Sequence, residues 1–156
     1  MVDVVDKRTR SRMMAGIRGV NTKPELLLRR ALHAAGFRYR LYLKDLPGKP
    51  DMVFPRYGAV IFVHGCFWHC HAGCKWAARP ASNVEFWIQK LNRNVERDAQ
   101  NVDGLRRLGW RVGQVWECAM RLQPIEEIAE SVGMWLLSSN PSLTLPRRPL
   151  GRLPQK

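Results

Sequence analysis

The sequence predicts an α/β fold in which a mixed central sheet is flanked by helices. Residues 59–63 (AVIFV) are apolar at every position, which is typical of a central strand covered on both faces. Residues 22–36 and 82–109 each combine a capping signal at the start with a glycine at the end, as helices do. The predicted order along the chain is α-β-β-β-α-β-α, and this order favours helices packed against a mixed sheet.

The first half of the chain is predicted to hold one helix and three strands. A basic arm over residues 1–20 precedes the helix, whose capping box places Thr22 at the N-cap and Glu25 three residues later. Residues 37–43 (FRYRLYL) alternate apolar and basic side chains, which predicts a half-buried strand. A Pro-Gly turn then leads into a short apolar strand over residues 52–54, and the AVIFV strand follows.

The second half is predicted to hold two helices, one strand and a tail. A second capping box at residues 82–85 (SNVE) opens a long helix that runs to about Leu108. Residues 110–116 (WRVGQVW) form the next predicted strand, and residues 124–138 form an amphipathic helix with acids in its first turn. Residues 141–156 are Pro-rich and basic, so we expect them to form a flexible tail.

The composition indicates a packed, strongly basic protein. The chain has 156 residues, 46% of them hydrophobic, and six tryptophans, so we expect a single globular domain over residues 1–140. Its 26 Lys and Arg against 13 acids give a net charge of +13, which favours nucleic acid as the partner. A membrane surface is less favoured, because the basic residues do not gather on one amphipathic face. Without an apolar leader or a membrane-length run, we expect a cytoplasmic protein.

Soft metal ligands are concentrated directly after the predicted central strand. Residues 63–74 read VHGCFWHCHAGC, and Cys118 follows the strand at 110–116, which a neighbouring place in the sheet would bring close. In a reducing compartment such a group indicates metal more than disulfides. A structural zinc site takes four ligands, and the spacing alone leaves open which candidate is left out. Buried cysteines acting as small apolar side chains are the alternative. The five candidates are Cys66, Cys70, His71, Cys74 and Cys118.

A second group of residues has the chemistry of phosphodiester hydrolysis. If the strands at 52–54 and 59–63 pair as a hairpin, Asp51 approaches the backbone near His64, and a carboxylate with a main-chain carbonyl can hold Mg²⁺ against a phosphate. A neutral histidine nearby, such as His69, can take a proton from water. Taken singly, an aspartate after a turn and a capping glutamate are ordinary structural residues. Their combination with a basic surface favours a nuclease.

Four segments resemble the very-short-patch repair (Vsr) DNA mismatch endonucleases: GKPDMVF, AVIFVHGCFWHCH, EFWIQKLNRNVERD and GWRVGQVWEC. The resemblance runs from about Val4 to about Leu136. It implies a restriction-endonuclease-like fold of the PD-(D/E)xK class, with residues 62–64 (FVH) in place of the usual ExK half. It also implies a Mg²⁺-dependent enzyme that nicks one DNA strand 5′ to the thymine of a T·G mismatch. Such mismatches arise from deaminated 5-methylcytosine.

The resemblance also assigns roles to individual residues. It implies that Asp51 and the main-chain carbonyl of Val63 hold the magnesium ion. His69 is then the general base, oriented by Asp98, and two further residues have supporting positions. The implied catalytic set is Asp51, His69, His64, Glu25 and Asp98. The implied ligands of a structural zinc ion are Cys66, His71, Cys74 and Cys118, with Cys70 in place of His71 left open.

DNA contacts follow from the same resemblance. Phe67, Trp68 and Trp87 match an aromatic wedge that enters the duplex beside the mismatch from the major groove, while Met14 enters from the opposite groove. Asn94 is a further expected DNA contact. Stacking on aromatic side chains is a known way to open a weak base step, and packing into the core is the alternative for these rings.

The expected partner is double-stranded DNA with a T·G mismatch. The resemblance implies functional links to a 5-methylcytosine methyltransferase and to general mismatch repair proteins. We expect a monomer that does not bind membranes. A non-catalytic DNA-binding module held together by zinc is the alternative from another functional class, and the carboxylate beside two histidines disfavours it.

Overall fold

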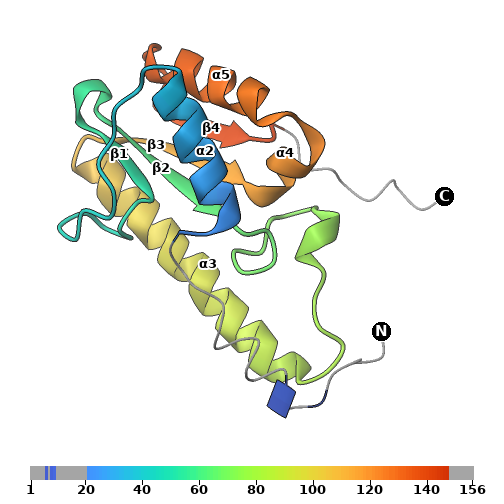
Figure 1. Ribbon diagram of the computed structural model, residues 1–156. Helices are drawn as coiled ribbons and strands as arrows, with labels where there is room; N and C mark the ends of the chain where they lie inside the picture. Colours follow the sequence, from blue (N-terminus) through green and yellow to red (C-terminus); the bar gives the residue numbers. More distant parts are fainter. Residues whose placement is uncertain (1–5, 7, 10–20, 148–156) are drawn as a thin grey trace.

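The structure is a computed structural model that describes residues 6, 8–9 and 21–147. Within this part, four strands form one open mixed sheet in the order β1-β2-β3-β4, with helices on both faces (Figure 1). This confirms the predicted α/β architecture. The strands are β1 (Met52–Phe54), β2 (Ala59–His64), β3 (Arg111–Trp116) and β4 (Ser142–Leu145). The helices are α2 (Lys23–Ala34), α3 (Val84–Arg107), α4 (Glu117–Leu122) and α5 (Ile125–Leu136).

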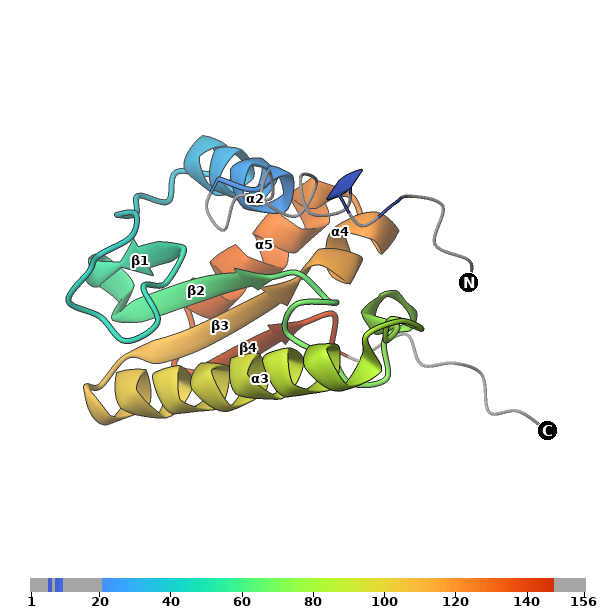
Figure 2. The same cartoon turned by 90° about the horizontal axis from the view of Figure 1, so that it is seen from below.

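Helices α2 and α5 cover one face of the sheet, and α3 covers the other (Figure 2). Strand β2 supplies both cores: Ile61 and Val63 pack toward α2 and α5, while Val60 and Phe62 pack toward α3. This explains why the strand is apolar at every position, as expected for a central strand. No helix of the described ranges is long and apolar enough to cross a membrane.

The pairing of the first three strands brings the site residues together at the C-terminal ends of β2 and β3. β1 and β2 form an antiparallel hairpin in which Met52 pairs with Ile61, so the residue before β1 lies near the end of β2. β2 and β3 run parallel, with His64 opposite Trp116. The segments that follow these two residues therefore leave the sheet side by side.

Both predicted helix starts are close to the observed ones, but the capping contacts differ. Thr22 is the N-cap of α2, yet its hydroxyl donates to the Glu25 carboxylate (3.1 Å) instead of accepting from the helix. Glu25 accepts the N–H of Asn21 (3.2 Å), one residue earlier than a capping box requires. In α3 the N-cap is Asn83, in a left-handed conformation (φ 50°), and not Ser82.

The strand predicted over residues 37–43 is wrong. Only one bridge forms, in which Arg40 and Val53 exchange two backbone hydrogen bonds of 2.8 Å. Tyr42 has a positive φ of 48°, which ends the extended conformation. Its hydroxyl donates to Glu25 (2.6 Å), so the segment is held by a polar contact to α2 and not by a strand ladder.

The flexible tail predicted from residue 141 is also wrong in its first part. Residues 142–145 form β4, parallel to β3, with Leu145 buried and Leu143 packed on the main core. Strand β3 has this free edge, so pairing satisfies its backbone groups. Residues 148–156 lie outside the described part, and so does the predicted basic arm apart from residues 6, 8 and 9. Helix α4, directly after β3, was not predicted.

Arg111 ties the end of α5 to the sheet. Its guanidinium donates to the carbonyls of Trp135 (3.0 Å) and Leu136 (2.9 Å) at the helix C-terminus. It also donates to the carbonyls of Tyr57 (2.9 Å) and Asn140 (3.2 Å), which precede β2 and β4, the two strands that flank β3. A cation at a helix C-terminus also complements the helix dipole. This one side chain thus links the end of α5 to the segments that precede β2 and β4.

Candidate functional site

One cleft at the C-terminal end of β2 gathers the residues that the sequence predicts to be catalytic. The cleft has a volume of about 1350 Å³ and is bounded by the start of α2, the segment before β1, the end of β2 and α3. Its lining combines carboxylates with lysine and arginine side chains, and the cations suit a phosphate backbone. The predicted catalytic and magnesium-binding residues on its wall are Glu25, Asp51, Val63, His64, His69 and Asp98. The cations on its wall are Lys44, Lys49, Lys90 and Arg97.

Asp51 is held at the end of β2 by the hairpin. Its Oδ2 accepts the backbone N–H of Val63 (2.6 Å), which confirms the approach that the sequence predicts. Burial, followed by the nearby Glu25 carboxylate, raises the pKa of Asp51 to about 7. A largely buried carboxylate of this kind is stabilised by a cation, and a carboxylate with the adjacent main-chain carbonyl gives hard oxygen donors of the type Mg²⁺ prefers. The residues present therefore fit a magnesium site.

Glu25 is a fixed, fully bonded carboxylate. It is 2% exposed and accepts from Arg29 (2.9 Å), the Tyr42 hydroxyl (2.6 Å), the Asn21 N–H (3.2 Å) and the Thr22 hydroxyl (3.1 Å). These contacts hold it at the base of the cleft as a supporting residue and a negative charge near Asp51. Sequence reasoning missed Arg29 and Tyr42; the signal for Arg29 was its place one helical turn after Glu25.

His69 and Asp98 form a hydrogen-bonded pair on the cleft wall. His69 Nδ1, in the loop after β2, lies 2.5 Å from Asp98 Oδ2 of α3. A carboxylate only accepts, so Nδ1 carries the proton and Nε2 is left as the basic nitrogen. The ring of His64 stacks on that of His69, with centroids 4.0 Å apart and an interplanar angle of 10°. Burial, with His69 as the second cause, lowers the pKa of His64 to about 3, so the stacked ring is neutral.

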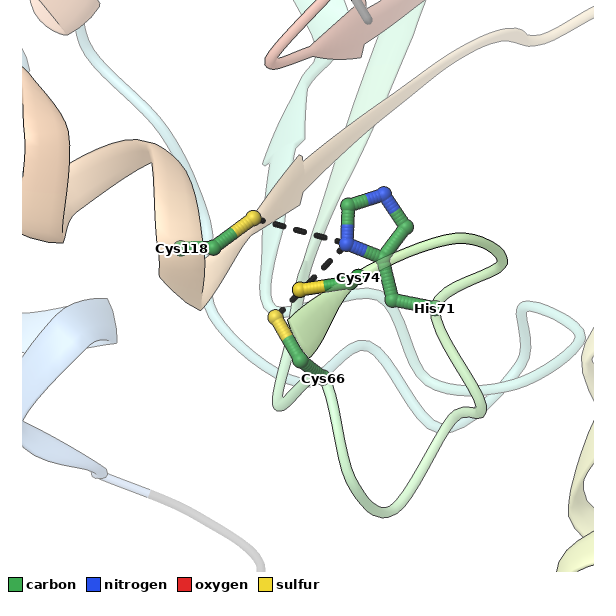
Figure 3. A group of neighbouring side chains, drawn as sticks. All are labelled: Cys66, His71, Cys74 and Cys118. Carbon is green, nitrogen blue, oxygen red and sulfur yellow. Dashed lines mark hydrogen bonds between the residues drawn. The ribbon is translucent and has the colours of Figure 1, made fainter. Parts of the chain in front are cut away.

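A second cluster joins the loop after β2 to the start of α4. The donor atoms of Cys66, His71, Cys74 and Cys118 all lie within 4.8 Å of one another and point toward a common centre (Figure 3). His71 Nδ1 is 3.7 Å from Cys66 Sγ and 3.4 Å from Cys118 Sγ. Tetrahedral zinc with ordinary bond lengths would place sulfur and nitrogen ligands about 3.6 Å apart. Both nitrogen–sulfur distances are close to this value, so the donor set suits a zinc ion.

The thiols of this cluster have the chemistry of metal ligands. Burial raises the pKa of the Cys118 thiol, with the neighbouring Cys66 thiol as the next cause, and burial also raises the pKa of Cys66. Buried thiols ionise when a cation replaces their protons, and this couples metal binding to folding. Among the described residues the cluster includes His71 and omits Cys70, whose side chain is half-buried. The geometry thus favours the ligand set that the resemblance implies.

The predicted aromatic residues also meet. Phe67 and Trp68 contact each other (centroids 5.0 Å apart), and Trp87 of α3 lies 5.5 Å from Phe67 and 5.9 Å from Trp68. All three are half-buried, and none belongs to the apolar cores of the described residues. Lys90 Nζ lies 5.6 Å from the ring centres of both tryptophans. An aromatic surface beside a cation is suited to stacking on bases.

Two further predicted DNA contacts have different outcomes. Asn94 uses its amide within the protein: it donates to the Trp68 carbonyl (3.0 Å) and accepts from Arg97 (2.6 Å). It therefore holds the loop that carries Phe67 and Trp68 (the aromatic loop) against α3. Met14 lies outside the described residues. Phe86, which the sequence analysis did not single out, is 59% exposed and extends the aromatic surface next to Trp87.

Known proteins are similar in sequence to this chain over most of its length. The family model described as DNA mismatch endonuclease Vsr matches residues 2–75. The DNA mismatch endonuclease Vsr of Escherichia coli is 47% identical over 121 residues, which are 78% of this chain and 77% of that protein. The Type II nicking enzyme V.XorIIP of Xanthomonas oryzae is 44% identical over 120 residues, 77% of this chain and 88% of that protein. The Type II nicking enzyme V.NmeAIP of Neisseria meningitidis is 42% identical over 125 residues, 80% and 89% of the two chains. The predicted resemblance is thereby confirmed, and the chain belongs to the Vsr family of DNA mismatch endonucleases.

Proposed function

We propose that this protein nicks one strand of duplex DNA on the 5′ side of the thymine in a T·G mismatch, by Mg²⁺-dependent hydrolysis. Membership of the family makes it a DNA endonuclease of mismatch repair, and the proposal adds the mismatch, the strand and the metal. The observation that carries it is one cleft with Asp51 on one wall and the His69–Asp98 pair on another. Deaminated 5-methylcytosine gives this mismatch, so the substrate depends on a cytosine methyltransferase.

The histidine pair supplies the proton transfer. His69 Nε2 takes a proton from the water that attacks phosphorus, and Asp98 both fixes the ring and stabilises the imidazolium that forms. Asp51 and the carbonyl of Val63 would hold the magnesium ion. When bound, Mg²⁺ neutralises charge on the phosphate oxygens and orients the attack. Cations on the cleft wall would bind the flanking phosphates.

We also place the fold among the restriction-endonuclease-like nucleases of the PD-(D/E)xK class. Support comes from the hairpin, which sets Asp51 before β1 against residues 62–64 at the end of β2. In that class a carboxylate and the ExK half of the motif share this arrangement; here FVH replaces ExK. The lysine role would then pass to His69, which reaches the same cleft from the loop.

Zinc in the Cys₃His cluster would be structural. The four side chains would supply all the ligands that a structural zinc ion takes, with none left to water. The segment from Cys66 to Cys74 has only turns, so the metal would fix a loop that lacks regular structure of its own. That loop carries Phe67 and Trp68, which we assign to opening the base step at the mismatch. Opening is least costly where the pair is already weakened.

A duplex with one T·G mismatch, labelled on either strand, tests the proposal. We expect a single nick in the thymine strand that requires Mg²⁺, and no nick in the paired duplex. Asp51→Asn should abolish nicking and leave affinity for the mismatch within about a few-fold, because affinity comes mainly from phosphate contacts. Asp45→Asn, at an exposed position of the same segment, is the matched control and should nick normally.

Two results would contradict the proposal. Nicking by Asp51→Asn at the wild-type rate would remove Asp51 from the metal site. Tight binding to the mismatch by a wild-type protein that never cleaves would favour the alternative, a zinc-stabilised DNA-binding module without catalysis.

A further inference from the structure

Trp116 lies between the metal cluster and the catalytic histidines and contacts both. Its ring stacks on that of His71, with centroids 4.1 Å apart and an interplanar angle of 6°. It meets the ring of His64 nearly at a right angle, with centroids 5.1 Å apart and an angle of 81°. Trp116 is the last residue of β3 and is paired with His64 across the sheet, so its backbone position is fixed by the strand ladder.

The ring of His64 is held by packing. It is 5% exposed, and its Nδ1 is a buried atom that lacks a hydrogen-bond partner within the described part of the chain. Ring contacts from Phe62 (5.4 Å), Trp116 and His69 therefore set its orientation. Removing one of these three walls would leave the imidazole free to change its rotamer.

The orientation of His69 depends in turn on His64. The bond from Nδ1 to Asp98 fixes one atom of the His69 ring, and the ring can still rotate about that bond. Stacking on His64 at an interplanar angle of 10° removes this remaining freedom. A catalytic group must stay within about 0.5 Å and 10–20° of its working geometry, so this second restraint matters for the rate.

We propose that Trp116 is a positioning residue for strand nicking: anchored on His71 of the Cys₃His cluster, it holds the ring of His64 so that His64 fixes the plane of His69. This inference rests on the proposed function, because it assumes that His69 is the general base. It assigns the Cys₃His cluster a second effect: His71 fixes the ring of Trp116, Trp116 fixes that of His64, and His64 fixes the ring that carries Nε2 of His69. The metal cluster then supports the chemistry as well as the aromatic loop.

The test compares Trp116→Leu with Trp110→Leu. Trp110 lies just before the opposite end of the same strand, is also half-buried, and packs in the core under α3. For Trp116→Leu we expect retained zinc, unchanged affinity for the T·G duplex without Mg²⁺, and single-turnover nicking slower by about tenfold or more. Trp116→Phe should fall between this variant and the wild type. Trp110→Leu should nick within about twofold of the wild-type rate.

A second measurement does not require activity. In spectra of protein with isotope-labelled histidine, Trp116→Leu should shift or broaden the ring signals of His69, which stacks on His64 and makes no ring contact with Trp116 within the described part of the chain. In a His64→Ala background, the same substitution should slow nicking no further. If wild-type protein fails to cleave T·G duplexes, the proposed function fails, whereas the spectra still test the ring contacts.

Three outcomes would overturn the inference. The first is wild-type nicking by Trp116→Leu with its zinc retained. The second is a loss of rate that matches a loss of zinc, which would limit Trp116 to packing around the metal. The third is an unchanged His69 spectrum. If Trp116→Leu does not fold, Trp116→Phe takes its place, and an unchanged rate with an unchanged spectrum overturns the inference.

Discussion

Replacing Asp98 tests how much of the proposed chemistry depends on one contact of 2.5 Å. Asp98→Asn keeps an oxygen that can accept from His69 Nδ1 but removes the charge. A hydrogen bond to a charged group contributes about 1.5–3 kcal/mol, against about 0.5–1.5 for a neutral pair, so we expect nicking to slow by roughly tenfold. Both side chains are less than a third exposed (29% and 21%), so water screens the pair only in part. Asp98→Ala removes the acceptor and the fixed tautomer, and its loss should approach the about 10²–10⁴-fold typical of general-base catalysis.

The assay is single-turnover nicking of a labelled T·G duplex, with affinity measured separately in the absence of Mg²⁺. Asp103→Asn is the control, since this carboxylate lies on the same helix and pairs with Arg107 (2.7 Å) on the exposed side. Affinity should stay constant through the series, because Asp98 binds a histidine and not a phosphate. Nicking by Asp98→Ala within about threefold of the wild-type rate would refute the assignment of His69 as general base.

Three other predictions concern the metal, the mismatch and the fold. Cys118→Ser should lose zinc and unfold, while Cys70→Ser should keep its zinc and its fold, as measured by elemental analysis and thermal melting. The reverse pattern would make Cys70 a ligand in place of Cys118. Trp68→Ala should lower the preference for T·G over paired duplex by roughly tenfold, because it removes about 1–3 kcal/mol of stacking, and salt-sensitive binding should not change. If the variant instead melts at a much lower temperature and keeps its preference, Trp68 is a core residue. Arg111→Met removes the guanidinium donor from four carbonyls, of which those of Trp135 and Asn140 keep other donors. It should lower the free energy of unfolding by about 2 kcal/mol in urea titrations, against about 0.5 kcal/mol for the exposed Arg107→Met.

The elements with a strong periodic signal were predicted correctly from the sequence. Strand β2 is apolar at every position because α2 and α5 cover one face and α3 the other. Helices α3 and α5 carry apolar stripes at helical spacing, and their ends agree with the prediction to within a few residues. In these segments local preference and burial favour the same structure, so the pattern is sufficient.

The errors fall where distant contacts decide the local structure. Residues 37–43 have the alternation of a strand, but Tyr42 adopts a positive φ and donates to a glutamate of α2. Residues 142–145 lie among prolines and basic residues that resemble a tail, yet they pair with the free edge of β3. Neither the polar contact nor the free edge can be recognised within the segment itself.

The candidate site was predicted better than its supporting residues. The catalytic and metal-binding side chains do gather as expected, and their roles stay predictions. Spacing could not decide between Cys70 and His71, because the decision depends on backbone bonds: the His71 N–H donates to the Cys66 carbonyl (3.0 Å), and the Cys74 N–H donates to the His71 carbonyl (3.2 Å). These turns bring His71 back toward Cys66. Trp116 was predicted as a strand residue only, because its contacts with His64 and His71 arise from the folded structure.

The loop between β2 and α3 carries three of the four candidate metal ligands, the proposed base, and Phe67 and Trp68, yet it contains little regular structure. Its rigidity must therefore come from outside. Cys118 of α4 meets one side in the Cys₃His cluster, while Asp98 and Asn94 of α3 hold His69 and the Trp68 carbonyl on the other. The two anchors belong to elements on either side of β3 in the sequence, and both pack against the sheet. The catalytic geometry thus depends on how firmly α3 and α4 are seated. A substitution that loosens either helix should slow nicking even where no residue of the cleft has changed.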